Sequence, residues 1–338
     1  MKTWETPFIA ENIAPKNAKR LVIFYGSTKL CEVDASKMQP KNLGSKLYSF
    51  GALSDVHVID STKANFQKSL SYLNNVEHVD FICIDGDLTA QGTSDQYAFY
   101  KNCVNEYSPN TPVYEVTGNH DVETFTGTTD FVKPYLGEDL YYSFTQGNDL
   151  FIMFGMQGWK TTGETFSNES LQWLYDTLEA NRNKRVFLFE HCPRFDGSGN
   201  PYPPVPTGDI LLSFSGTIFK RLMEHYKNVI WFHGHTHITF EAQNDVSYAN
   251  YDRLHGCHSV HLPSTMAIKT LNNAGTGYDG DTTKPMGHVV EVYENNIVLR
   301  GCDFGSNKYV NIAQYCLDTT PIDIPEKSFT DSTGTIIT

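Results

Sequence analysis

Three short apolar segments between residues 48 and 121 each end in side chains of the types that bind metal ions. The three endings are Asp55-Val56-His57, Gly86-Asp87 and Gly118-Asn119-His120-Asp121. Apolar segments rich in β-branched and aromatic residues, closed by Gly or Asp, are typical of buried strands in an α/β sheet. Because ligands of such sheets bind beyond the carboxyl ends of the strands, we expect these side chains to meet at one sheet edge.

Helical patterns separate the three predicted strands. Apolar side chains recur at intervals of three and four residues within residues 61–75 and within residues 94–107. This spacing predicts one helix with a buried face in each range. The order strand, helix, strand, helix, strand predicts one half of a doubly wound sheet.

Two later strands are predicted to end on histidines. Residues 186–190 lead directly to His191, and residues 229–233 lead to Gly234-His235-Thr236-His237. An antiparallel pair is expected at 141–144 and 150–154, and helices are expected at 169–181 and 218–225. Short strands predicted at 259–262, 287–292 and 297–299 suggest a second sheet packed against the first.

The two ends of the chain differ from the central region. Residues 20–25 and 29–33 predict a hairpin, so residues 1–47 are expected to form a small N-terminal β appendage that packs on the main domain. A remnant of an upstream β domain is the alternative interpretation of this segment. Residues 319–338 are polar and predict an extended C-terminal tail, which leaves residues 48–318 for the main domain.

Composition limits the partners and the compartment. The formal net charge of −13 argues against bulk nucleic acid and anionic membranes as partners, and no apolar run is long enough to span a membrane. The seven cysteines form no Cys-x-x-Cys pair, and residues 1–20 contain no hydrophobic signal segment. These features favour a cytoplasmic protein, with an extracellular one as the alternative if the chain is trimmed from a longer secreted protein. The oligomeric state stays open.

In their order along the chain, the five polar endings resemble the motifs of the calcineurin-like metallophosphoesterases. Each ending by itself is common, but five of them in the family's order, each after a predicted strand, form a specific pattern. The resemblance covers roughly residues 48–304. It implies an α/β fold, a four-layer αββα sandwich of two packed mixed sheets, with a dinuclear metal centre at one end of the sheets.

The resemblance also implies two ligand sets that share one carboxylate. The first metal ion would be held by Asp55, His57 and His237, the second by Asn119, His191 and His235, and Asp87 would bridge them. Carboxylate, imidazole and amide donors together suit manganese, iron or zinc rather than calcium.

The implied reaction is the hydrolysis of a phosphomonoester or phosphodiester. A hydroxide shared by the two metal ions attacks phosphorus, and His120 is the expected general acid for the leaving group. Asp121 is expected to orient the His120 imidazole and to favour its protonated form. The alternative function is a catalytically inactive binding or scaffolding protein of the same fold. Such proteins normally lose metal ligands or the general acid, whereas this sequence contains every expected ligand and the expected acid.

Departures from two subgroups narrow the substrate. Gly86-Asp87 continues with Leu88-Thr89-Ala90, not with the Val-Asp-Arg-Gly segment of protein serine/threonine phosphatases, and Ala90 stands where purple acid phosphatases place a tyrosine ligand. Asp121 and the Gly-His-Thr-His ending look more similar to bacterial phosphodiesterases of the cyclic-nucleotide type. We therefore expect a small phosphoester substrate, such as a nucleotide or a phospholipid headgroup.

Residues 193–214 form an insertion rich in Pro and Gly directly after His191. Loops beside a rigid site usually carry specificity, so Arg194, Phe195 and Tyr202 are candidates to contact a phosphate or to stack on a base. The alternative is that the prolines only stiffen a surface loop.

Overall fold

The structure is a computed structural model of the 338-residue chain. It describes residues 20–25, 28–34, 43–61, 63–122, 136, 139–160, 163–195, 201–202, 214–241, 250–252, 256–266, 268–271, 278–281 and 283–318. At some of these positions, including both strands of the N-terminal hairpin, only the backbone is described.

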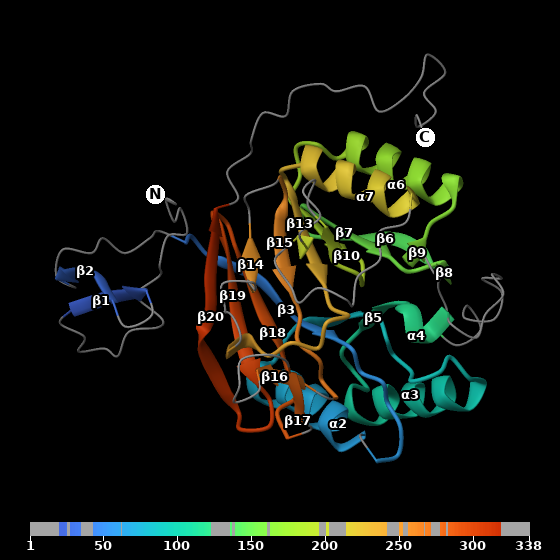
Figure 1. The fold of residues 1–338 in the computed structure, drawn as a ribbon, viewed down its shortest axis with the longest axis horizontal. Coiled ribbons are helices and arrows are strands. Elements are labelled where there is room, and N and C mark those ends of the chain that lie inside the picture. Colours follow the sequence, from blue (N-terminus) through green and yellow to red (C-terminus); the bar gives the residue numbers. More distant parts are fainter. Residues whose placement is uncertain are drawn as a thin grey trace.

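The first large sheet has six strands in the order β20-β19-β18-β3-β4-β5 (Figure 1). These strands are β3 (Lys46–Ser54), β4 (Phe81–Asp85), β5 (Val113–Val116), β18 (Met286–Tyr293), β19 (Asn296–Asp303) and β20 (Lys308–Asp318). Strands β3, β4 and β5 run parallel, and the other three continue the sheet in antiparallel pairing. Helix α2 (Lys63–Tyr72), extended by the π-helical turn η2 (Leu73–Glu77), connects β3 to β4, and α3 (Ser94–Tyr107) connects β4 to β5. The predicted doubly wound half is therefore confirmed.

The second large sheet also has six strands, in the order β14-β15-β13-β10-β7-β6. These strands are β6 (Tyr141–Gln146), β7 (Asp149–Phe154), β10 (Val186–Phe189), β13 (Val229–His233), β14 (Tyr251–Asp252) and β15 (His258–His261). The four central strands run parallel, and the two edge strands are antiparallel to their neighbours. Helix α6 (Asn168–Ala180) connects β7 to β10, and α7 (Phe214–His225) connects β10 to β13.

Smaller elements surround the two sheets. They are the short helix α4 (Asn119–Val122) and the paired strands β8 (Gly158–Lys160) with β9 (Gly163–Thr165), β11 (Arg194–Phe195) with β12 (Pro201–Tyr202), and β16 (Ile268–Leu271) with β17 (Tyr278–Asp281). Among the helices that the structure describes, none is long and apolar enough to cross a membrane.

Alternation along the strands produces four layers. In β3, Leu53 packs with α2 and α3, whereas Phe50 and Ala52 pack against the second sheet. The aromatic rings between the sheets interlock, because Phe151 of β7 meets Phe50 edge-on at a centroid distance of 5.3 Å. A third core joins the outer face of the second sheet to α6 and α7. Figure 1 shows α2 and α3 on one side of the paired sheets and α6 and α7 on the other, which confirms the αββα sandwich.

Side-chain caps set where two of these helices begin. The hydroxyl of Thr93 accepts a hydrogen bond from the Gln96 N–H at the start of α3, and Ser167 caps the Ser170 N–H of α6 in the same way at 3.1 Å. Each cap satisfies one of the donors that a helix start leaves without an intrahelical partner.

One expectation about the last third of the chain is wrong. Strands β18 and β19 lie where strands are predicted, but β18 pairs with β3 and β19 pairs with β18, so both belong to the first sheet and not to the second. The register sets Val290 opposite Phe50, so the inward side chains of β18 extend the same core. Among the described strands of that region, β15 alone joins the second sheet. Strand β20, at the edge of the first sheet, is not predicted from the sequence, because its polar residues interrupt the alternation of apolar and polar side chains.

The N-terminal hairpin is present. Strands β1 (Arg20–Tyr25) and β2 (Thr28–Asp34) pair antiparallel, with Arg20 opposite Asp34. Lys46 and Leu47, which are predicted to belong to the appendage, are the first residues of β3, and Leu43 packs against Val298 and Cys316. How the side chains of the hairpin pack, and the extended tail predicted at 319–338, fall outside what the structure describes.

Two buried histidines predict acid sensitivity of the fold. Burial lowers the pKa of His261 and of His288 from 6.5 to about 3, so both rings are neutral in the folded chain. As the pH falls below 6.5, these rings bind protons in the unfolded chain but stay neutral in the folded chain until the pH approaches 3. Acidification in this range therefore favours the unfolded chain and lowers the stability of the fold. Each histidine should lower the free energy of unfolding by about 2 kcal/mol when the pH falls from 7.5 to 5.

Denaturant unfolding of chelator-treated protein at these two pH values measures this loss. We expect His288→Leu to lose less stability on acidification than the unmodified protein. An equal loss in both proteins would contradict the assignment of His288 as a neutral buried group.

Candidate metal centre

Seven of the predicted ligands lie at the carboxyl ends of five strands. Asp55 and His57 follow β3, Asp87 follows β4, Asn119 begins α4 after β5, His191 follows β10, and His235 and His237 follow β13. Potential ligand atoms of six of them form two groups, one of Asp55, His57, Asp87 and His237 and the other of Asp87, His191 and His235, and within each group these atoms all lie within 4.8 Å of one another. The two large sheets therefore contribute to one centre.

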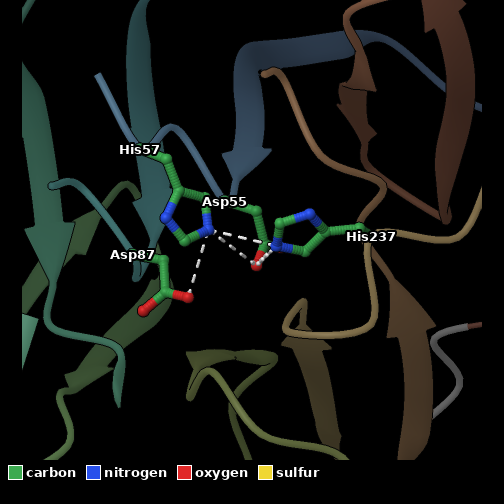
Figure 2. A group of neighbouring side chains, drawn as sticks. All are labelled: Asp55, His57, Asp87 and His237. Atoms are coloured by element: carbon green, nitrogen blue, oxygen red, sulfur yellow. Dashed lines mark hydrogen bonds and ion pairs between the residues drawn. The ribbon is translucent and has the colours of Figure 1, made fainter. Parts of the chain in front are cut away.

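The first group places two imidazole nitrogens face to face (Figure 2). The Nε2 atoms of His57 and His237 are 3.0 Å apart. Oδ1 of Asp55 lies 3.1 Å from the His237 Nε2, and Oδ2 of Asp87 lies 3.3 Å from the His57 Nε2. Two ring nitrogens, each with a lone pair, repel at this distance unless a proton or a cation lies between them.

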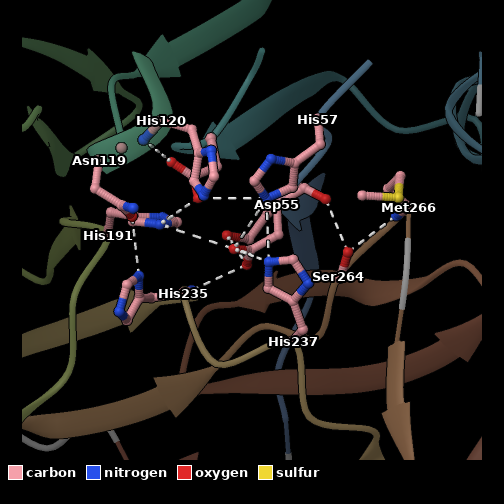
Figure 3. Close-up of polar contacts among 12 residues, drawn as sticks. Asp55, His57, Asn119, His120, His191, His235, His237, Ser264 and Met266 are labelled. Atoms are coloured by element: carbon pink, nitrogen blue, oxygen red, sulfur yellow. Dashed lines mark hydrogen bonds and ion pairs between the residues drawn. The ribbon is translucent and has the colours of Figure 1, made fainter. Parts of the chain in front are cut away.

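The second group uses the same oxygen of Asp87. Its Oδ2 lies 3.3 Å from Nε2 of His191, and Nδ1 of His235 lies 3.0 Å from Oδ1 of Asn119 (Figure 3). Asp87 is thus common to both groups, as expected for a bridging carboxylate. The metal centre predicted from the sequence required Asp87 to lie close to these histidines.

Two buried atoms of the centre fit cation binding. Asp55 Oδ1 and His191 Nε2 are both buried, and neither has a hydrogen-bond partner among the described residues. An unsatisfied buried polar atom costs about 1–3 kcal/mol. The other ring nitrogen of His191 lies 2.7 Å from the carbonyl oxygen of Asp85, which can only accept, so Nδ1 keeps its proton and Nε2 is the nitrogen that can lose a proton and offer a lone pair to a cation. The donors therefore fit two divalent cations.

Electrostatic coupling keeps the carboxylates ionised. Burial acts to raise the pKa of Asp55, but the imidazoles of His237 and His191 outweigh it and hold that pKa well below the usual range. For His191, burial acts to lower the pKa, and the carboxylates of Asp87 and Asp55 raise it well above the usual value. Burial lowers the pKa of His57 to about 4. Because a cation competes with the proton on such rings, metal binding should release protons.

Five of the ligands have an unusual backbone conformation. The φ angles of Asp55, His57, Asp87, His235 and His237 lie between 40° and 69°. Residues other than glycine rarely adopt this left-handed region, which persists only where the surroundings enforce it. Here strand-end hydrogen bonds enforce it, for example from the His57 N–H to the Asp87 carbonyl at 2.8 Å. The tight turns aim the side chains at the centre.

Close approach explains two glycines of the motifs. A Cβ atom on Gly234 would overlap with the side chains of Ser54 and Asp55, and a Cβ on Gly118 would overlap with Asp87. Any larger residue at either position would displace a ligand.

Asp121 is hydrogen-bonded to the loops around it, and its expected role in orienting His120 stays a prediction. Its Oδ1 accepts from the backbone N–H and the hydroxyl of Thr89, and its Oδ2 accepts from the N–H groups of Leu88 and Gly118. Burial and the charge of Asp87 raise its pKa to about 6, against the effect of these donors. The imidazole of His120 instead lies 2.8 Å, through Nδ1, from the carbonyl oxygen of Ala90. Asp121 therefore ties together the loops that carry Asp87 and Asn119.

We expect Asp121→Asn to destabilise the fold by about 3 kcal/mol, since an amide turns an NH₂ group towards N–H donors. Denaturant unfolding measures the change, with the exposed Asp95→Asn as the matched control. If stability stayed at the control value while turnover alone fell, the result would support the predicted orienting role instead.

The predicted substrate-contact residues are described only by their backbone. Arg194 pairs with Tyr202, and Phe195 with Pro201, in the antiparallel ladder of β11 and β12. Their side chains, and most of the insertion at 193–214, fall outside the described part of the chain.

Two serines at the centre are not predicted from the sequence. Oγ of Ser54 lies 2.8 Å from Oδ2 of Asp55, and Oγ of Ser264 donates to the Asp55 carbonyl at 2.8 Å. Strand alternation alone assigns Ser54 to the inner face of β3, so this residue could have been found. Nothing in the sequence connects Ser264 to Asp55, because 209 positions separate them.

Comparisons with known proteins show which family the chain belongs to. The family model for the calcineurin-like phosphoesterases matches residues 48–239. A comparison with curated proteins gave no match. Among solved structures, GAP50, described as the anchor in the inner membrane complex of Plasmodium, is 14% identical and matches with a TM-score of 0.53 over 86% of this chain and 92% of that chain. This likeness shows a shared fold.

Two further solved structures match with lower scores. The protein TT1561 of Thermus thermophilus is 11% identical over 81% of this chain and 100% of its own, with a TM-score of 0.43. YfcE, a phosphoesterase from E. coli, is 11% identical over 79% of this chain and 97% of its own, with a TM-score of 0.37.

Proposed function

This chain belongs to the calcineurin-like phosphoesterase family, and from that premise we propose that it hydrolyses phosphomonoesters or phosphodiesters with the help of two divalent metal ions. The observation that carries the proposal is the position of Asp87, whose carboxylate belongs to both groups of potential ligands. A carboxylate has two anionic oxygens and can serve two cations at once.

The residues at the centre divide into two sets. Asp55, His57 and His237 would hold one ion, Asn119, His191 and His235 would hold the other, and Asp87 would contact both. When bound, two such ions supply Lewis acidity that activates water and offsets the charge of a phosphoryl group. The mixed oxygen and nitrogen donors suit manganese, iron or zinc.

His120 is proposed to donate a proton to the leaving oxygen. Because the Ala90 carbonyl can only accept, His120 keeps a proton on Nδ1, and the proton that it can transfer is on Nε2 of the imidazolium form. Its ring meets the His57 ring edge-on at a centroid distance of 4.6 Å, so it lies beside the first group of ligands. His120 is partly exposed, whereas His57 is buried, which suits a residue that meets substrate.

The proposed substrate is a small phosphoester such as a nucleotide or a phospholipid headgroup. The net charge of −13 disfavours bulk nucleic acid. Arg194, Phe195 and Tyr202 are proposed to contact it, since the insertion that carries them follows His191 directly.

Metal analysis combined with hydrolysis assays tests the proposal. The chain should bind two ions of manganese, iron or zinc and hydrolyse p-nitrophenyl phosphate or its bis ester. Chelation should abolish turnover, and the metal should restore it. A filled centre without turnover on these esters, on nucleotides or on phospholipid headgroups would favour the binding or scaffolding alternative.

A further inference from the structure

Ser54 occupies the last inward-facing position of β3. Phe50 and Ala52, four and two residues earlier, face the second sheet and form part of the core between the sheets. Ser54 is fully buried; its backbone pairs with Asp85 of β4 on one side and forms an isolated bridge with Ser264 on the other. A hydroxyl therefore stands at the point where the apolar core meets the metal centre.

The Ser54 hydroxyl lies between two acceptors. Its Oγ is 2.8 Å from Oδ2 of Asp55 and 2.7 Å from the carbonyl oxygen of Asp85. A serine hydroxyl has one hydrogen, so it donates to one of these oxygens at a time. The Asp85 carbonyl also accepts the Nδ1–H of His191 at 2.7 Å. Through one hydroxyl, Ser54 contacts a ligand of the first ion and the carbonyl that orients a ligand of the second.

The remaining contacts of Asp55 leave one atom for a metal ion. Oδ2 also accepts the His235 N–H at 3.0 Å, and the Asp55 carbonyl accepts the Ser264 hydroxyl at 2.8 Å (Figure 3). Oδ1 alone has no hydrogen bond among the described residues, and it faces the imidazoles of His237, His191 and His57. The hydrogen bonds therefore set the direction in which Asp55 presents its ligand oxygen.

We propose that Ser54 is a positioning residue that couples the two metal sites by fixing Asp55 and His191 together. The inference rests on the metal centre proposed above. Ser264 differs from Ser54, because its hydroxyl donates to the backbone carbonyl of Asp55 and not to the Asp55 carboxylate, and it accepts from the Met266 N–H. Residues that orient metal ligands typically change metal affinity by about 10-fold to 100-fold when they are replaced.

Calorimetric titration of the chelator-treated full chain with Mn²⁺ tests the coupling. Ser54→Ala should weaken both binding steps by about 10-fold. Ser264→Ala should weaken only the step at the site that contains Asp55. Ser49→Ala removes a buried hydroxyl from an earlier position of the same strand and should leave both steps unchanged.

A nuclear magnetic resonance measurement separates positioning from a general loss of stability. The His191 Nδ1–H signal of the metal-free chain should shift in Ser54→Ala, because the hydroxyl that lies 2.7 Å from the Asp85 carbonyl oxygen is removed, and should stay in place in Ser264→Ala. If Ser54→Ala weakened one step only, or behaved as Ser49→Ala does, the coupling would be wrong. If the unmodified chain bound no Mn²⁺, the proposed metal centre itself would fail.

Discussion

Asp87→Ala should empty both metal sites and reduce phosphoester hydrolysis by about 10⁴-fold or more. The same carboxylate oxygen lies 3.3 Å from His57 of one ligand group and 3.3 Å from His191 of the other. Its removal would take an anionic ligand from each ion and leave the imidazoles of His57 and His191 without their closest carboxylate. Elemental analysis after metal loading, together with kcat/KM on p-nitrophenyl phosphate, measures both effects.

Asp95→Ala is the matched control, because it removes the same charge from an exposed position in the first turn of α3. It should keep both ions and full activity. If Asp87→Ala kept one ion at normal affinity, Asp87 would be a ligand of a single ion, and the two groups would act separately.

His120→Asn should keep both metal ions and lower kcat by about 10²-fold to 10⁴-fold, the usual contribution of general acid catalysis. His120 belongs to neither ligand group, and its Nδ1 pairs with the Ala90 carbonyl. The loss should be largest for alkyl phosphates, whose leaving oxygen needs a proton, and smallest for p-nitrophenolate, which leaves readily without one. The measurement is kcat on a series of esters with leaving groups of rising pKa.

His78→Asn provides the control for this change. His78 is exposed and adopts a φ of 53°, a conformation that asparagine tolerates well. The His78→Asn substitution should not alter turnover or metal content. Loss of the metal ions from His120→Asn would show that His120 acts as a ligand and not as an acid.

The local sequence was sufficient to predict that the candidate metal ligands lie at the ends of strands. The strands before Asp55, Asp87 and His191 end as the hydrophobic pattern predicts, because alternation and chain breakers are short-range properties. The αββα architecture follows from the resemblance and is confirmed. Pairing between strands was harder to predict, because β18 pairs with β3 although the two strands lie far apart in the sequence.

The role of each polar side chain depended on residues far away in the chain. Asp121 and His120 are neighbours in sequence, yet the strand-end turns direct one to the N–H groups of Leu88 and Thr89 and the other to the Ala90 carbonyl. Ser264 reaches Asp55 across 209 positions. The sequence by itself determined which residue types are available to the metal centre. Only the tertiary structure decided which atom each of them presents, because hydrogen-bond direction depends on partners that folding brings together.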